Sequence, residues 1–173
     1  MSKNQDILEG LVVECCEALF AHYGVDLAFA PDTSRAEVWD EDLALAGIIG
    51  FTADELRGSL VLAMGRAPLE AVDAEAARHR DWIQELSNQL LGRVKNRLLG
   101  YGVDLKMTTP LSMRGVRLTL EGSSEDSAPL LFRTAAGGAV CVMVDEEVKP
   151  GFEFEKAEGA EDACPEEGEL LLF

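Results

Sequence analysis

Basic residues are scarce in this chain. It carries 15 Lys and Arg against 32 Asp and Glu, so its formal net charge at pH 7 is −17. Proteins that bind nucleic acid or an anionic membrane surface need a basic footprint to attract those partners. The composition therefore argues against both nucleic acid and membranes as partners.

Long hydrophobic runs are also lacking. The longest uncharged apolar stretch runs from Leu43 to Phe51, whereas a membrane-spanning helix needs about 20 such residues. The first ten residues, MSKNQDILEG, contain no apolar core of the kind found in secretory signal peptides. We therefore expect the protein to be cytoplasmic.

Metal-binding and nucleotide-binding motifs are missing too. The chain has two His and four Cys, without a CxxC spacing, so the sequence predicts reduced structural thiols and no metal site. Neither the phosphate loop GxxxxGK[ST] nor the nucleophile motif GxSxG occurs. No cofactor is expected in this chain.

The apolar content of 47% is typical of a folded domain. Helical periodicity appears over 6–24, 67–79 and 82–100, and two Gly-bounded apolar runs over 43–65 predict a β-hairpin. Strands are also predicted near 25–30, 103–108, 115–121, 128–135 and 139–145. Residues 1–150 should form one domain. Residues 151–173, with eight acids and one base, are predicted to form an acidic, largely disordered tail.

One pentapeptide, YGVDL, occurs at 23–27 and again at 101–105, 78 positions later. Each copy follows a predicted long helix and precedes predicted strands. The run GSLVLAM at 58–64 is similar to GAVCVM at 138–143, at an offset of 80. The shared order predicts an internal duplication, in which two helix-plus-sheet halves pack about a pseudo-two-fold axis.

The two halves differ on their long helices. At about 100° per residue, the helix over 82–100 places its apolar positions on one face: Ile83, Leu90, Val94 and Leu98. The opposite face carries Glu85, Asn88, Gln89, Gly92 and Asn96. Glu85 and Asn88 are three residues apart and therefore project together. Counting back 78 positions, the first helix has Ile7 and Gly10 instead, so only one half carries the polar pair.

The segment ELSNQLLGRVKNRLLGYGVDLKMTTP resembles the signature helix, strand and Pro turn of the CheX-like chemotaxis phosphatases, which are relatives of CheC and FliY. GIIGFTADELRGSLVLAMG is similar to the preceding hairpin of that family. The resemblance covers about residues 5–148. It implies an α/β (α+β) fold with a duplicated architecture, in which long helices pack on a mainly antiparallel sheet.

The resemblance also implies a reaction. This family removes phosphate from the phospho-aspartate of a CheY-type response regulator. Carried over to this chain, Asn88 would orient the attacking water and Glu85 would pair with a lysine of the partner. Gln89, Gly92 and Asn96 would line the partner-binding face, Mg²⁺ would belong to the phosphorylated receiver, and the protein would be a homodimer.

Two alternatives remain open from the sequence. In the first, the chain is a non-catalytic CheX-like module that docks a receiver or another signalling protein. Leu91, where the family usually has a small residue, and a short connection over 68–82 favour this reading. In the second, the chain is a structural paralogue related to flagellar-switch components, although it shows no switch-binding peptide near its N-terminus.

Overall fold

The computed structural model describes residues 3–33, 37, 41–72, 78–123 and 127–156. Two 20-residue helices dominate it, α1 (Lys3–His22) and α4 (His79–Leu98). The remaining elements are shorter: β1 (Leu27–Phe29), β2 (Leu45–Thr52), β3 (Leu56–Met64), α3 (Arg66–Val72), the 3₁₀ turn η2 (Leu99–Tyr101), β4 (Lys106–Met107), β5 (Leu111–Arg114), β6 (Leu130–Thr134) and β7 (Ala139–Val148).

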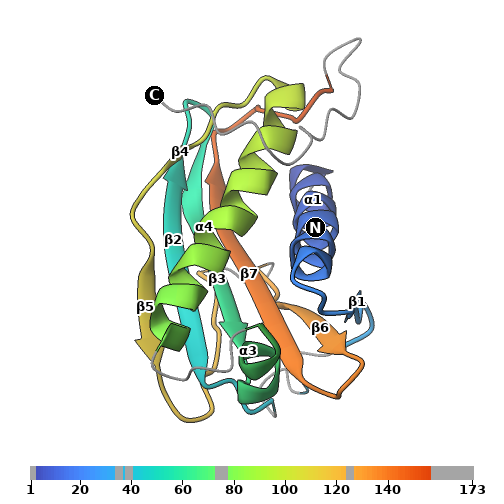
Figure 1. The fold of residues 1–173 in the computed structure, drawn as a ribbon. Coiled ribbons are helices and arrows are strands. Elements are labelled where there is room, and N and C mark those ends of the chain that lie inside the picture. Colours follow the sequence, from blue (N-terminus) through green and yellow to red (C-terminus); the bar gives the residue numbers. More distant parts are fainter. Residues whose placement is uncertain (1–2, 34–36, 38–40, 73–77, 124–126, 157–173) are drawn as a thin grey trace.

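The strands form one antiparallel sheet in the order β1-β6-β7-β3-β2-β4, and β5 also pairs with β2. Both long helices lie across the same face of this sheet (Figure 1). The predicted α+β class, with long helices on a mainly antiparallel sheet, is confirmed.

The sheet also confirms the predicted duplication. At its centre β3 pairs with β7, and Leu62 lies opposite Val142, 80 positions further along the chain. Leu60 pairs with Val144, and Met64 pairs with Val140. The duplication relates these two pairs, because Leu60 corresponds to Val140 and Met64 corresponds to Val144. On the two flanks β1 pairs with β6, and β4 pairs with β2. The pseudo-two-fold axis therefore passes through the middle of the sheet.

The repeated pentapeptide is the stop signal of both long helices. Gly24 and Gly102 have the same left-handed φ of 73°, a conformation that glycine adopts without steric cost. The amide of Val25 donates to the carbonyl of Phe20 at 3.0 Å, and that of Val103 to Leu98 at 3.1 Å. These bonds satisfy carbonyls that a helix end would otherwise leave unpaired.

Alternation along the central strands divides the apolar side chains between two faces. The face beneath the helices carries Leu60 and Leu62 of β3, with Val140 and Val142 of β7, and forms the larger core. The opposite face holds a smaller cluster that consists of Leu43, Ala46, Val61, Ala63, Leu120, Leu131, Ala139, Cys141 and Met143. The sheet is therefore apolar on both sides, and its helix-covered side holds most of the core.

The strand predicted at 115–121 is wrong. The strand of this region is β5, which begins earlier, and the chain then crosses the outer face of the sheet. Arg117 has a φ of 53°, which breaks the extended conformation. Leu120 is buried and Leu118 half-buried in the smaller cluster, while Val116 is 87% exposed. Val116, Leu118 and Leu120 alternate as in a strand, but Leu118 and Leu120 cover the sheet instead of extending it.

The packed part of the chain continues beyond residue 150, into the segment predicted to be a disordered tail. Phe154 is 2% exposed, and its amide donates to Asn4 Oδ1 at 2.8 Å. Its ring meets Tyr101 edge-on at 5.9 Å. Across the duplication, Asn4 occupies the position of Trp82, so Phe154 supplies the aromatic ring that α1 lacks there. Residues 157–173 of the predicted tail lie outside the described residues.

Helix α4 packs closely against β2 at Gly47. A Cβ at this position would overlap Ser87 Oγ and lie 2.7 Å from the carbonyl oxygen of Ile83. The hydroxyl of Ser87 donates to that same carbonyl at 2.7 Å, so this small polar side chain is satisfied within its own helix. The Gly47–Ser87 contact sets the distance between the helix and the sheet.

We expect Gly47→Ala to lower the free energy of unfolding by about 1–3 kcal/mol, because the added methyl group overpacks this contact. Urea denaturation followed by circular dichroism would measure the change. Gly10→Ala is the matched control, since a Cβ there meets nothing within 4 Å. Equal stability of the two variants would contradict the importance of the contact.

Candidate functional site

The five residues predicted for the site all lie on the solvent side of α4. Glu85, Asn88 and Asn96 are exposed, and Gln89 and Gly92 are half-buried. The other side of the helix is buried against the sheet and α1 through Ile83, Leu86, Ser87, Leu90, Leu91, Val94 and Leu98. Because that wide apolar side is buried, the five predicted residues form a polar stripe that faces solvent. At the two-fold-related positions of α1, Ile7 is half-buried and Gly10 is exposed.

Leu91 lies on the buried side of α4. It is 1% exposed and belongs to the core beneath the helices. The border between the buried and exposed sides of α4 passes between Asn88 and Leu91, so Leu91 no longer favours a non-catalytic module. The other feature that favoured a binding module, the short connection over 68–82, falls partly on residues 73–77, which lie outside the described residues.

A groove of about 560 Å³ runs beside the polar pair. One wall consists of α4 side chains, Asp81, Gln84, Glu85 and Asn88. The other wall is the segment between β4 and β5, Met107, Thr108, Thr109 and Pro110. The Pro turn of the sequence motif thus lies across a groove from the helix of the same motif.

Hydrogen bonds hold the second wall in place. The amide of Thr108 donates to the carbonyl of Gly50 at 2.9 Å, and the amide of Gly50 donates to Thr108 Oγ1 at 2.9 Å. On the helix side, Gln84 Nε2 donates to the carbonyl of Pro110 at 3.3 Å. Sequence reasoning missed Gln84, because only the fold brings it to the turn. The groove is therefore braced by both β2 and α4.

The carboxylate of Glu85 is oriented by a chain of side chains. Gln89 Nε2 donates to Glu85 Oε1 at 2.7 Å, and the Tyr23 hydroxyl donates to Gln89 Oε1 at 3.0 Å. The Tyr23 ring in turn meets Trp82 edge-on, with centroids 5.2 Å apart. Gln89, predicted as partner-binding, is thus engaged within the chain, and Tyr23 is a site neighbour that periodicity could not reveal.

Asn88 presents its carboxamide to the groove without a hydrogen bond to any residue that the structure describes. Glu85 likewise has no cationic partner within the described ranges. A carboxamide offers both donors and an acceptor, and an exposed carboxylate attracts a cation. The pair can therefore orient a small polar molecule and bind a positive group at the same time.

The basic residues of α4 are held within the chain. Lys95 Nζ lies 3.1 Å from Asp104 Oδ1, and the Arg97 guanidinium lies 3.5 Å from Glu14 Oε2. Arg93 also has a partner. The surface of this helix that remains for an external partner is thus dominated by the polar stripe.

In the residues that the structure describes, no group of three or more His, Cys, Asp or Glu side chains could hold a metal ion. The Cys15, Cys16 and Cys141 thiols are buried, and burial raises the pKa of Cys141 to about 12. None of the described helices is long and apolar enough to cross a bilayer.

Comparison with solved structures shows which fold the chain has. A CheC-like superfamily protein from Shewanella sp. PV-4 superposes with a TM-score of 0.66 at 16% identity, over 81% of this chain and 97% of that one. The chain has a CheX-like fold. CheX from Vibrio vulnificus gives a TM-score of 0.62 at 16% identity, covering 81% of this chain and 93% of its own.

A third similar structure is that of CheX from Borrelia burgdorferi, solved in complex with CheY, BeF₃ and Mg²⁺. It superposes with a TM-score of 0.57 at 12% identity, over 80% of this chain and 96% of that chain. No protein-family model and no curated protein sequence matches the chain. The CheX-like assignment thus describes its fold.

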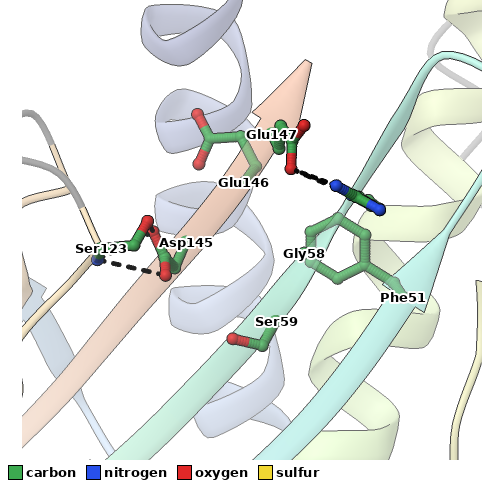
Figure 2. Close-up of a pocket in the computed structure, with 8 residues that line it drawn as sticks. Phe51, Gly58, Ser59, Ser123, Asp145, Glu146 and Glu147 are labelled. Atoms are coloured by element: carbon green, nitrogen blue, oxygen red, sulfur yellow. Dashed lines mark hydrogen bonds and ion pairs between the residues drawn. The ribbon is translucent and has the colours of Figure 1, made fainter. Parts of the chain in front are cut away.

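A second hollow, of about 440 Å³, lies where β3 and β7 meet the segment at Ser123 (Figure 2). Charged side chains around this hollow form ion pairs and hydrogen bonds with neighbouring residues. The Arg57 guanidinium and Glu147 are 2.7 Å apart, and Asp145 Oδ1 accepts the hydroxyls of Ser123 at 2.7 Å and Ser127 at 2.9 Å. These bonds lower the pKa of Asp145 and fasten the crossing segment to the CheX-like sheet. The hollow is therefore part of the scaffold.

Glu146, between these residues, points to the helix-covered face, as Val144 and Val148 do. Desolvation, reinforced by the charge of Glu9 on α1, raises the pKa of Glu146 to about 7. The folded state therefore favours the protonated carboxyl. Its contribution to stability is complete below the unfolded pKa, roughly 4.3, and is lost as the pH rises through about 7.

We expect Glu146→Gln to raise the free energy of unfolding by about 1 kcal/mol at pH 8, a value discounted for partial solvent screening, and to change it little at pH 4. Thermal unfolding at the two pH values would measure this. Glu147→Gln, an exposed neighbour paired with Arg57, should show no such gain at pH 8. A gain from Glu146→Gln that is the same at both pH values would contradict the assigned titration.

Proposed function

We propose that this protein accelerates hydrolysis of the phospho-aspartate of a CheY-type receiver domain. The observation that carries the proposal is a pair of side chains on one helix face: the carboxamide of Asn88, which has no hydrogen bond within the described residues, and the oriented carboxylate of Glu85, which has no cationic partner among them. The groove beside them is open to a partner. The CheX-like fold also agrees with the resemblance of the sequence motif to the CheX-like phosphatases, which supports the proposal.

In this mechanism Asn88 enters the active site of the receiver and holds a water molecule in line with the phosphorus. The water oxygen attacks phosphorus, the bond from phosphorus to the aspartate oxygen breaks, and the receiver regains its carboxylate while inorganic phosphate leaves. An acyl phosphate is already reactive, so positioning of the water is most of what a catalyst must provide.

Glu85 has a different role. Its carboxylate would pair with a lysine at the phosphate site of the receiver and hold the helix in register. Hydrogen bonding to Gln89 leaves Glu85 Oε2 available for such a contact. Because the two side chains lie three residues apart on one helix, docking by Glu85 places Asn88 at a fixed distance from the phosphoryl group.

The similar CheX structure with bound CheY supports the choice of partner. We assign Mg²⁺ to the receiver and not to this chain. The cytoplasm is the expected location, because CheY-type receivers act there. The homodimer implied by the resemblance remains a prediction. Leu111 and Met113 on β5, 67% and 50% exposed, offer apolar surface close to the groove.

The alternative is a CheX-like module that docks a receiver without turnover. The sequence offered two features in its favour, Leu91 and the short connection over 68–82, and the second falls partly outside the described residues. Since Leu91 is buried in the core, the docking face retains both polar residues without added bulk. The enzyme is therefore the better-supported reading, and turnover measurements separate the two.

We expect Asn88→Ala to lower the rate of catalysed dephosphorylation about 100-fold or more, because the variant cannot position the water. The measurement is phosphate release from a CheY receiver phosphorylated with a small-molecule phosphodonor in the presence of Mg²⁺. Affinity for a beryllofluoride-loaded receiver should change little.

Asn96→Ala is the matched control for this substitution. It removes the same carboxamide from the same face of α4, eight residues along, and should leave kcat within about twofold while raising KM. Turnover retained by Asn88→Ala would contradict the role of Asn88. Binding without turnover by the wild-type protein would establish the docking module instead.

Gly92→Ala tests how closely a partner approaches. A Cβ at Gly92 meets nothing within 4 Å in this chain, and replacing a helical glycine by alanine stabilises a helix by about 1 kcal/mol. We therefore expect a slightly more stable protein whose KM for the phosphorylated receiver is raised, measured in the same phosphate-release assay. An unchanged KM would show that the partner does not contact the backbone at this position.

A further inference from the structure

We infer that Tyr23 is a positioning residue for receiver docking, acting through Gln89 on the carboxylate of Glu85. The effect on docking rests on the proposed function, whereas the hydrogen bonds that join Tyr23, Gln89 and Glu85 are a property of the free protein. The first half of the molecule lacks the Glu-Asn pair, and the inference gives it a role in the site of the second half.

The geometry provides a continuous path between the two helices. Tyr23 lies at the end of α1, and its hydroxyl donates to Gln89 Oε1 at 3.0 Å. The carboxylate of Glu85 can only accept, so it requires the nitrogen end of the Gln89 carboxamide, which donates to Glu85 Oε1 at 2.7 Å. The hydroxyl of Tyr23 engages the oxygen end and thereby holds the carboxamide in this orientation.

The Tyr23 ring is itself held in place. It is half-buried and packed against the core, and it meets Trp82 edge-on at 5.2 Å with an interplanar angle of 87°. Trp82 precedes Glu85 by three residues and therefore lies one turn away on the same helix. Ring packing against Trp82 and hydroxyl bonding to Gln89 thus connect the end of α1 to two positions on α4 that lie about two turns apart.

The duplication provides an internal comparison. Tyr101 is the equivalent residue of the second pentapeptide, and its ring packs against Phe154. The residue of α1 that corresponds to Gln89 is Leu11, which has no hydrogen-bonding side chain. Within the described residues, the hydroxyl of Tyr101 has no hydrogen-bond partner. Among the described residues, this relay from a tyrosine hydroxyl through Gln89 therefore reaches only the helix that carries a glutamate to position, α4.

A long, exposed glutamate side chain has many rotamers, and docking must restrict them at an entropic cost. A bond from Gln89 restricts them before the partner arrives. Since Glu85 docks and Asn88 does the chemistry, loss of the relay should affect binding and leave the chemical step nearly intact. This separates the relay from a general structural role.

The test is Tyr23→Phe, which removes one hydroxyl and keeps the ring against Trp82. With a Mg²⁺-bound, phosphorylated CheY receiver, KM should rise about three- to tenfold, the value of one hydrogen bond, while kcat stays within about twofold. Tyr101→Phe is the matched control and should match the wild-type protein in both constants.

Coupling is tested by combining substitutions. In a Glu85→Ala background, Tyr23→Phe should have no further effect on KM, because the group that it positions is absent. Gln89→Glu keeps an acceptor for Tyr23 but loses the donor to Glu85, so its KM should rise at least as much as that of Tyr23→Phe. Additive effects of Tyr23→Phe and Glu85→Ala would overturn the inference.

A measurement without any receiver separates failure of the relay from failure of the proposed function. The side-chain amide of Gln89 should give ordered NMR signals in the wild-type protein and in Tyr101→Phe, and averaged signals in Tyr23→Phe. If these signals are already averaged in the wild-type protein, the relay is wrong. If they are ordered but the protein neither binds nor dephosphorylates the receiver, the proposed function is wrong, and the role in docking fails with it.

Discussion

The antiparallel pairing of β3 with β7 is the interaction on which the rest of the structure depends. It joins the two halves into one sheet, with Leu62 and Val142 at its centre. Each half alone is a helix with a few strands, and such a unit exposes most of its apolar surface. Pairing at the centre produces one broad face on which α1 and α4 lie together, and both long helices thereby obtain their buried sides.

From this arrangement the site follows as an asymmetry. Two helices of equal length end in the same pentapeptide, yet they present different surfaces to solvent. Helix α4 retains a polar stripe beside a braced groove, whereas α1 has Ile7 and Gly10 at the corresponding positions. Aromatic packing shows the same divergence, since Trp82 meets one tyrosine and Phe154 meets the other. The duplication accounts for the fold, and the differences between its two halves account for the candidate site on α4.

The sequence predicted the features that depend on periodicity and repetition: the two long helices, the hairpin, the duplication and the exposed stripe of α4. It did not predict features that depend on tertiary packing. Alternating residues near 118 can line a strand or cover a sheet, and only backbone conformation distinguishes the two. The many acidic residues after residue 150 favoured a disordered tail, so the sequence did not predict that Phe154 is buried. A helical wheel already places Leu91 beside Leu98 on the apolar side of α4, but it could not show that Tyr23 reaches Gln89, because that contact depends on how α1 and α4 pack.

The interleaving of the halves has a consequence for synthesis. The central strand β3 obtains its second neighbour only when β7 is made, β1 pairs with β6, and Asn4 binds the backbone at Phe152 and Phe154. A nascent chain that has completed its first half therefore holds an unpaired, apolar strand edge until the second half leaves the ribosome. Such edges promote association with other chains, and contacts between distant residues slow folding. The pairing that joins the halves in the finished protein thus leaves the first half exposed to association while the second half is being made.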